Sequence, residues 1–157
     1  MKRPRYTNGH LDGLDEKILF HLGRDGRLPM KDLAGLIGLS APSTTERVRR
    51  LEETGIIEGY AARINPAAAG LMLAAYIRIR PMPGELKRVA DLVVSISAII
   101  ECDRVTGDDC FIAKAHFASV AELEAVIDRI LPFATTNTSV IQSSPVARRM
   151  PALPATR

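Results

Sequence analysis

Apolar residues near the start of the chain recur at three- and four-residue spacing, the period of a helix that is buried on one side. The first stripe comprises Leu14, Ile18, Leu19 and Leu22. Asp12 precedes it as a candidate N-cap, and Asp25-Gly26 ends it. A second, shorter helix is predicted between Pro29 and Gly38. Its inner face comprises Leu33, Ala34 and Ile37.

A third helix is predicted from about Ala41 to Thr54. Ser40 is one candidate for its N-cap, and Ser43-x-x-Glu46 forms a competing capping box. Because Gly38 closes the second helix and a tight turn follows at once, the three helices have the order and spacing of a helix-turn-helix. The apolar residues Ile56, Ile57, Tyr60 and Ile64 come next. This run predicts a short two-stranded wing or a hinge.

From Leu71 onward the pattern changes to an alternation of apolar and polar residues, which is typical of a strand with one buried face. Strands are predicted near residues 77–80, 99–106, 111–117 and 135–144, with helices near 86–93 and 120–130. The order βαββαβ is that of a ferredoxin-like domain, with an antiparallel sheet and both helices on one face. The Ile, Val and Ala residues along the strands favour pairing of the other face with a second sheet.

The fold class is therefore α+β, with a winged helix-turn-helix followed by a ferredoxin-like domain. We expect a flexible basic arm at residues 1–10, a DNA-binding domain at 11–57 and a wing or hinge linker at 58–70. The ferredoxin-like domain, with its expected role in oligomerisation, is expected at 71–146, and a disordered tail at 147–157.

Composition excludes some classes of protein. The hydrophobic fraction of 46% is ordinary for a globular chain, and the net charge of +3 is spread over both halves, so charge alone is weak evidence for nucleic acid. Two cysteines are too few for a disulfide framework and lack metal-site spacing. No apolar stretch is long enough to span a membrane. A reduced, cytoplasmic setting fits, with no metal and no cofactor.

The third helix carries the clearest candidate chemistry. Val48 and Leu51 fall on its buried side, so the polar and charged residues must face outward. Hydroxyl groups near the helix start suit contacts with phosphates and base edges, and guanidinium groups suit guanine edges or backbone oxygens. The candidates for binding double-stranded DNA are Ser40, Pro42, Ser43, Thr45, Glu46, Arg47, Arg49 and Arg50. The alternative is a solvated face with pairs such as Arg49–Glu53, and Arg47 lies at the border of the core.

Several stretches together resemble the Lrp/AsnC (leucine-responsive, feast/famine) family of transcriptional regulators. In the first half they are Leu11–Leu19, Asp25–Arg27, Leu33–Ser40, Glu46–Glu52 and Gly55–Tyr60. The second half adds Glu101-Cys102, Val105–Asp108 and Lys114. The resemblance implies a homodimer that commonly assembles into an octamer. It also implies an amino acid, or a similar small molecule, bound between dimers near the turn that joins the second and third strands.

Carried onto this sequence, the resemblance places the effector site at Thr106, Gly107, Asp108 and Asp109, opposite Thr136, Thr138 and Ser139. Carboxylates suit the ammonium group of an amino acid, and backbone amides or hydroxyls suit its carboxylate. The family pattern places an aromatic residue and a second Asp after Gly-Asp, whereas this chain has Asp109-Cys110. The identity of the effector therefore stays open.

No catalytic residues are predicted, because no nucleophile–base pair, phosphate-binding loop or metal cluster has a recognisable spacing. The main interpretation is a sequence-specific regulator of transcription that responds to an effector. The alternative is a nucleoid-type architectural protein that binds DNA broadly with little effector response.

Overall fold

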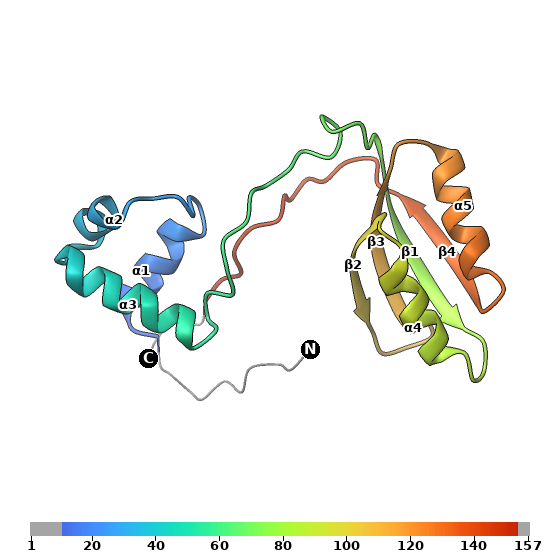
Figure 1. The fold of residues 1–157 in the computed structure, drawn as a ribbon, viewed down its shortest axis with the longest axis horizontal. Coiled ribbons are helices and arrows are strands. Elements are labelled where there is room, and N and C mark those ends of the chain that lie inside the picture. The colour runs from blue at the N-terminus through green and yellow to red at the C-terminus, as the bar shows by residue number, and fades with distance from the viewer. Residues whose placement is uncertain (1–10, 154–157) are drawn as a thin grey trace. The chain divides into compact units, whose positions relative to one another are not determined.

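The chain forms two compact units in a computed structural model that describes residues 11–153 (Figure 1). Of the described residues, the first unit comprises those up to Ala62 together with the segment from Val146, and the second comprises Arg63–Pro145. The predicted arm at residues 1–10 and the last four residues of the predicted tail lie outside the described residues.

Three helices make the first unit: α1 (Gly13–Leu22), α2 (Met30–Ile37) and α3 (Ala41–Glu53). Asp12 caps α1 as predicted, because its carboxylate accepts hydrogen bonds from the backbone N–H groups of Leu14 and Asp15, both at 2.9 Å. Gly38 ends α2 with a φ of 75°, a left-handed conformation that glycine adopts without strain. The predicted apolar stripes form the core: Ile18, Leu19, Leu22, Leu33, Ile37, Val48 and Leu51.

The third helix is capped by Ser40 rather than by the competing box at Ser43. The Ser40 hydroxyl accepts a hydrogen bond from the backbone N–H of Ser43 at 3.3 Å. Thr44, Val48 and Leu51 are buried on its inner side. The Thr44 hydroxyl donates to the carbonyl of Ser40 at 3.0 Å, so this buried polar group is satisfied.

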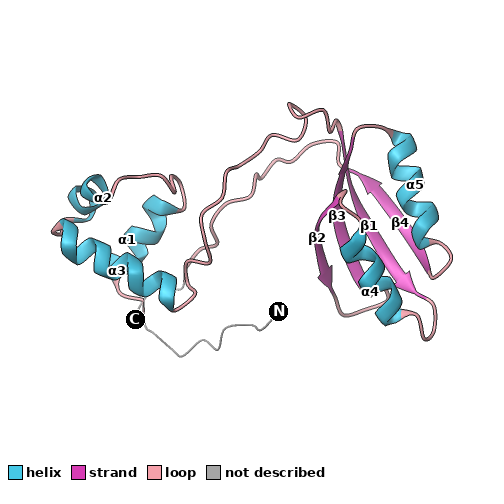
Figure 2. Cartoon of the chain, viewed as in Figure 1, coloured by secondary structure: helices cyan, strands magenta, loops and turns pink. Residues whose placement is uncertain are grey.

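The expected two-stranded wing is absent from the described part of the chain, where residues 54–72 run as loop and turn (Figure 2). The hinge alternative describes this segment better. Tyr60 anchors its start, because its hydroxyl donates to Glu52 on α3 at 2.9 Å. Burial and the neighbouring Glu52 carboxylate raise the pKa of Tyr60 to about 12.

The second unit has the predicted βαββαβ order. Its elements are β1 (Leu73–Pro81), α4 (Leu86–Ser95), β2 (Ile99–Arg104), β3 (Phe111–Phe117), α5 (Val120–Ile130) and β4 (Ala134–Val140). The strands form one antiparallel sheet in the order β2-β3-β1-β4, and both helices cover the same face (Figure 1). The core lies between this face and the helices, with Ile77, Ile79, Val89, Phe117 and Ile130 among its buried members.

The open face of the sheet differs from the sequence expectation. Most of the Ile and Ala residues of β1 and β3 point toward the helices and are buried there, namely Ala75, Ile77, Ile79, Ala113 and Ala115. Asp103, Ile112, Arg78 and Asn137 share one row across the open face, because residues paired across antiparallel strands point to the same side. Polar side chains therefore dominate the face that was expected to pair through apolar contacts.

The segment after β4 also differs from the expected disordered tail. Residues 146–153 have no regular secondary structure but belong to the first unit. Leu153 is half-buried against the helical core, and Met150 lies beside Gly23 at the end of α1. The apolar side chains of Met150 and Leu153 pack against the first unit. The prolines and arginines around them had led us to expect disorder.

Candidate functional site

The outer face of α3 is the first candidate site. Its buried stripe fixes the rotation of the helix, and as a consequence Pro42, Ser43, Thr45, Glu46, Arg49 and Arg50 are exposed. The N-terminal end of the helix carries the hydroxyl groups of Ser40 and Ser43, which lie 2.8 Å apart. A helix end of this kind presents partly positive backbone N–H groups together with side-chain donors, a combination that attracts phosphate.

Arg49 occupies the centre of this exposed face between two glutamates. Its Nη2 lies 2.7 Å from Glu46 Oε1 and its Nη1 lies 3.4 Å from Glu53 Oε1. The hydrogen bond from Arg49 lowers the pKa of Glu46 below its ordinary value. The Arg49 side chain is 59% exposed, and exposed ion pairs contribute little free energy. Arg49 can therefore exchange these partners for a base or a phosphate at small cost.

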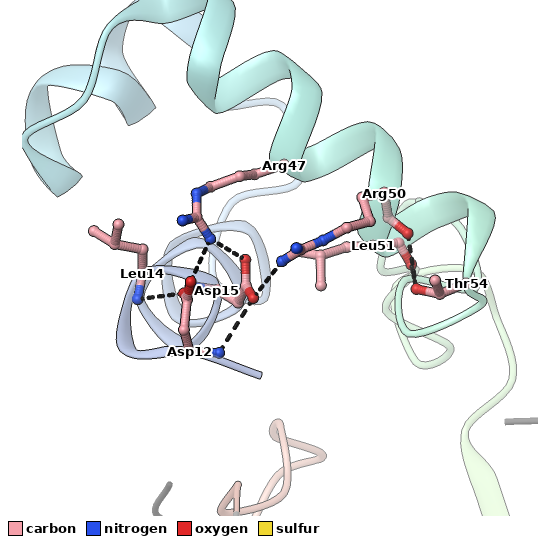
Figure 3. A network of polar contacts seen from close by, with 7 residues as sticks. All are labelled: Asp12, Leu14, Asp15, Arg47, Arg50, Leu51 and Thr54. Carbon is pink, nitrogen blue, oxygen red and sulfur yellow. Dashed lines mark hydrogen bonds and ion pairs between the residues drawn. The ribbon is translucent and has the colours of Figure 1, made fainter. Parts of the chain in front are cut away.

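Arg47 and Arg50 point the other way, toward the start of α1 (Figure 3). Arg50 Nη2 donates to Asp15 Oδ2 at 2.6 Å, and Arg47 Nη1 donates to Asp15 Oδ1 at 2.9 Å and to Asp12 Oδ2 at 2.7 Å. Asp15 is fully buried, so its charge needs these partners. Hydrogen bonds from the Asp15 backbone N–H and from Arg47 lower the pKa of Asp12.

This network alters the expectation for two of the predicted DNA-binding residues. Arg47 is mainly a tie between α3 and α1, with a side chain only 27% exposed. Arg50 is tied to the same carboxylate but stays 54% exposed. The network could not be predicted from the sequence, because Arg47 and Arg50 lie 32 and 35 residues beyond Asp15.

The second candidate site is a pocket of about 440 Å³ in the second unit. It is lined by Arg78, Arg80, Asp109, Thr135, Thr136 and Asn137. Arg80 holds the turn between β2 and β3, since its Nε donates to the Asp108 carbonyl at 2.9 Å and its Nη2 lies 3.5 Å from the Asp108 carboxylate. The turn reverses at Gly107, whose φ is 109°.

The pocket brings together part of the predicted effector site. Asp109 from the turn and Thr136 from β4 both line it. Thr138 and Ser139 point to opposite faces of the sheet, because Thr138 pairs with the buried Ile77 whereas Ser139 pairs with the exposed Tyr76. These two residues therefore do not form one wall, contrary to the expectation from the sequence.

Four lining residues of the pocket were not predicted from the sequence: Arg78, Arg80, Thr135 and Asn137. Arg78 and Arg80 are exposed positions of β1, and Asn137 lies between Thr136 and Thr138 on β4. The register of the sheet brings them together, since Arg78 pairs with Asn137 and Arg80 pairs with Thr135. Alternation along one strand carries no information about this register.

Among residues 11–153, no group of three or more His, Cys, Asp or Glu side chains could hold a metal ion. Within the same residues, no helix has the length and apolar character to cross a membrane.

Comparison with known proteins assigns the family. Residues 11–58 match the winged helix-turn-helix DNA-binding family, and residues 74–151 match the Lrp/AsnC ligand binding domain. The transcriptional regulator LrpA of Mycobacterium tuberculosis is 35% identical over 83% of this chain and 88% of its own length. The chain belongs to the Lrp/AsnC family. The resemblance noted in the sequence is thereby confirmed.

Solved Lrp/AsnC structures confirm the fold. LrpC of Bacillus subtilis has a TM-score of 0.85 and 32% identity, and the match covers 89% of this chain and all of LrpC. A feast or famine regulatory protein of M. tuberculosis, complexed with L-methionine, has a TM-score of 0.83 and 32% identity, with 90% of this chain and 98% of that protein covered. In this Lrp/AsnC protein the helix-turn-helix and the βαββαβ unit are both present as predicted.

Proposed function

We propose that this chain is a sequence-specific, DNA-binding regulator of transcription that responds to an amino acid or a related small molecule. The observation that carries the proposal is the geometry of α3, whose inner stripe is buried while its outer face stays open. The helix-turn-helix regulators that the chain resembles support it. A protein of this kind acts at the chromosome, so we place it in the cytoplasm.

We propose that base edges are read by the outer face of α3. Its short hydroxyl side chains allow close approach, and Arg49 can reach a guanine edge in the major groove. The residues assigned to this role are Pro42, Ser43, Thr45, Glu46 and Arg49, with Ser40 and Arg50 at the phosphate backbone. Arg47 belongs to the fold in this proposal, because both of its partners are carboxylates of α1.

We propose that the pocket beside Asp109 binds the effector. Among the described residues, the Arg78 guanidinium has no ion-pair or hydrogen-bond partner, so it can receive a carboxylate. Asp109 offers an oxygen to an ammonium group, and Thr135 and Asn137 add hydrogen-bonding groups. This combination suits a zwitterion. Thr106, Gly107 and Asp108 form the turn that carries Asp109, and Thr136 lies on the opposite strand, whereas Thr138 and Ser139 are peripheral.

A thermal-shift screen of the twenty amino acids tests the effector proposal, because a ligand that prefers the folded state raises the melting temperature. Arg78→Gln should abolish the response to the amino acid that wild type binds. Arg129→Gln, on α5, is the matched control and should retain the response. If no amino acid shifts wild type, the amino-acid effector is wrong while the DNA-binding proposal still stands.

We propose that the protein acts as a homodimer and assembles further, up to an octamer. The open face of the sheet supports dimerisation, since Glu101 and Asp103 on β2 share it with Arg78 on β1. Two copies related by a twofold axis can bring opposite charges together across such a face.

The alternative is a nucleoid-type architectural protein. DNase footprinting on duplexes enriched from a random-sequence pool, with and without each amino acid, separates the two. Discrete protected sites that change with one amino acid support the regulator. Continuous protection that ignores every amino acid supports the architectural role.

A further inference from the structure

We infer that Asp15 orients Arg50 as a phosphate clamp beside the reading face of α3, an inference that rests on the proposed DNA-binding function. Asp15 lies on α1 and has no exposed surface, so it cannot touch DNA itself. Arg50 reaches it with a single nitrogen, Nη2, at 2.6 Å (Figure 3). Asp15 is therefore a positioning residue, and Arg50 is the group that binds.

The chemistry of the guanidinium group allows both contacts at once. It carries five N–H donors in a rigid plane. Within residues 11–153, the Arg50 guanidinium contacts only Asp15, which leaves its other donors for an incoming oxygen. Because the Arg50 side chain is 54% exposed and the carboxylate beneath it is buried, an approaching phosphate meets the positive group first.

Arg47 provides the contrast. Its Nη1 is engaged by both Asp12 and Asp15, and its side chain is half as exposed as that of Arg50. Both arginines pair with the Asp15 carboxylate, but only Arg50 also keeps more than half of its side chain exposed. Arg47 therefore stabilises the packing of α3 on α1, whereas Arg50 is placed to bind a DNA phosphate.

The position of Arg50 along α3 fits this role. Ser43 lies seven residues earlier, so the two side chains fall on the same side of the helix, two turns apart. Ser43 also sits in the first turn, where the helix dipole favours an anion. A phosphate strand that follows this side of α3 can contact the helix start and Arg50 in succession.

Anchoring to Asp15 gives the clamp its advantage. If an arginine side chain becomes fixed only when DNA binds, its loss of rotational freedom weakens binding by about two- to tenfold. The contact with Asp15 fixes Arg50 when the protein folds. Removing the Asp15 charge should then weaken DNA binding even though the arginine remains.

Fluorescence anisotropy with a labelled random-sequence duplex tests the inference, because phosphate contacts are independent of sequence. Arg50→Ala should weaken binding about tenfold and reduce the slope of log K against log salt by about one per phosphate lost. Arg50→Lys should keep the slope but lose affinity. Arg47→Ala should lower the melting temperature and keep the slope.

The double-mutant cycle of Asp15→Asn with Arg50→Ala gives the decisive result. Asp15→Asn alone should weaken binding about two- to tenfold, and this effect should vanish in the Arg50→Ala background. An effect of the same size in both backgrounds overturns the inference, as does an Arg50→Ala variant with unchanged slope. If Asp15→Asn does not fold, equal slope changes for Arg47→Ala and Arg50→Ala overturn it. Failure of wild type to bind the duplex would instead refute the proposed function.

Discussion

Asp12 serves two purposes at the start of α1, as the helix cap and as a partner of Arg47. Its cap role could be predicted from its position before an apolar stripe. Its contact with Arg47 could not, because it depends on how α3 packs on α1. The same holds for Asp15, which reads in the sequence as an ordinary first-turn carboxylate and is in fact fully buried.

Asp12→Ala should destabilise the protein at neutral pH by about 1 kcal/mol, the usual value of an N-cap. The pKa of Asp12 is lowered in the folded state, mainly by the Asp15 backbone N–H. Its contribution is therefore complete above the ordinary pKa of 3.8 and is lost as pH falls through the lowered value. Urea denaturation of wild type and of Asp12→Ala, at pH 7 and at about pH 2, measures this difference in the free energy of unfolding. A stability difference that does not shrink in acid would contradict it.

Glu46→Gln should strengthen binding to a random-sequence duplex and steepen its salt dependence. The substitution removes a negative charge from the face of α3 and releases Arg49 from one partner. The free energy of unfolding should stay close to that of wild type, because the pair is exposed. Glu124→Gln on α5 is the control and should leave DNA affinity unchanged.

At the scale of elements, the period of apolar residues predicted the helices and the first strands of residues 11–153 in order, since burial on one face imposes it. The last strand was predicted from a polar run of β-prone residues instead. The predicted ends of the elements were less accurate. The last strand ends at Val140, whereas the sequence predicted that it would continue to Ser144. Of the predicted wing or hinge, the two-stranded form is not present in residues 54–72, because a strand needs a partner that the apolar pattern does not supply. The faces of β4 were also missed, since its polar residues gave no alternation to follow.

The segment at residues 146–153 provides a test at this scale. Deletion of residues 147–157 should lower the protection of α1 against hydrogen exchange, because Leu153 and Met150 no longer cover its surroundings. The second unit should keep its protection, since it has a separate core. Equal protection of α1 in the full and shortened chains would show that this contact contributes nothing.

At the scale of the whole molecule, the chain passes between its two units twice, near residue 62 and near residue 145. Each unit has its own core, with α3 on one and the pocket beside Asp109 on the other. The effector binding that we propose for this pocket would therefore act on α3 through assembly or through these connections. Paired reading helices in a symmetric dimer predict half-sites about one helical turn apart.

Sedimentation velocity should show a mass at least twice the 17.1 kDa of one chain. Arg78→Glu should shift the distribution toward the monomer, because it places a like charge on the face shared with Glu101 and Asp103. Lys17→Glu on α1 is the control and should leave the mass unchanged. A wild-type monomer at micromolar concentration would rule out the dimer.

The most direct test of the account is selection of preferred duplexes from a random-sequence pool by wild type and by Arg49→Gln. Wild type should enrich a pseudo-palindromic site. The variant should enrich the same spacing with relaxed preference at one base pair in each half, because Arg49 reads a base edge. If wild type enriches no site, or if both proteins prefer identical bases, the outer face of α3 does not read DNA in the way proposed.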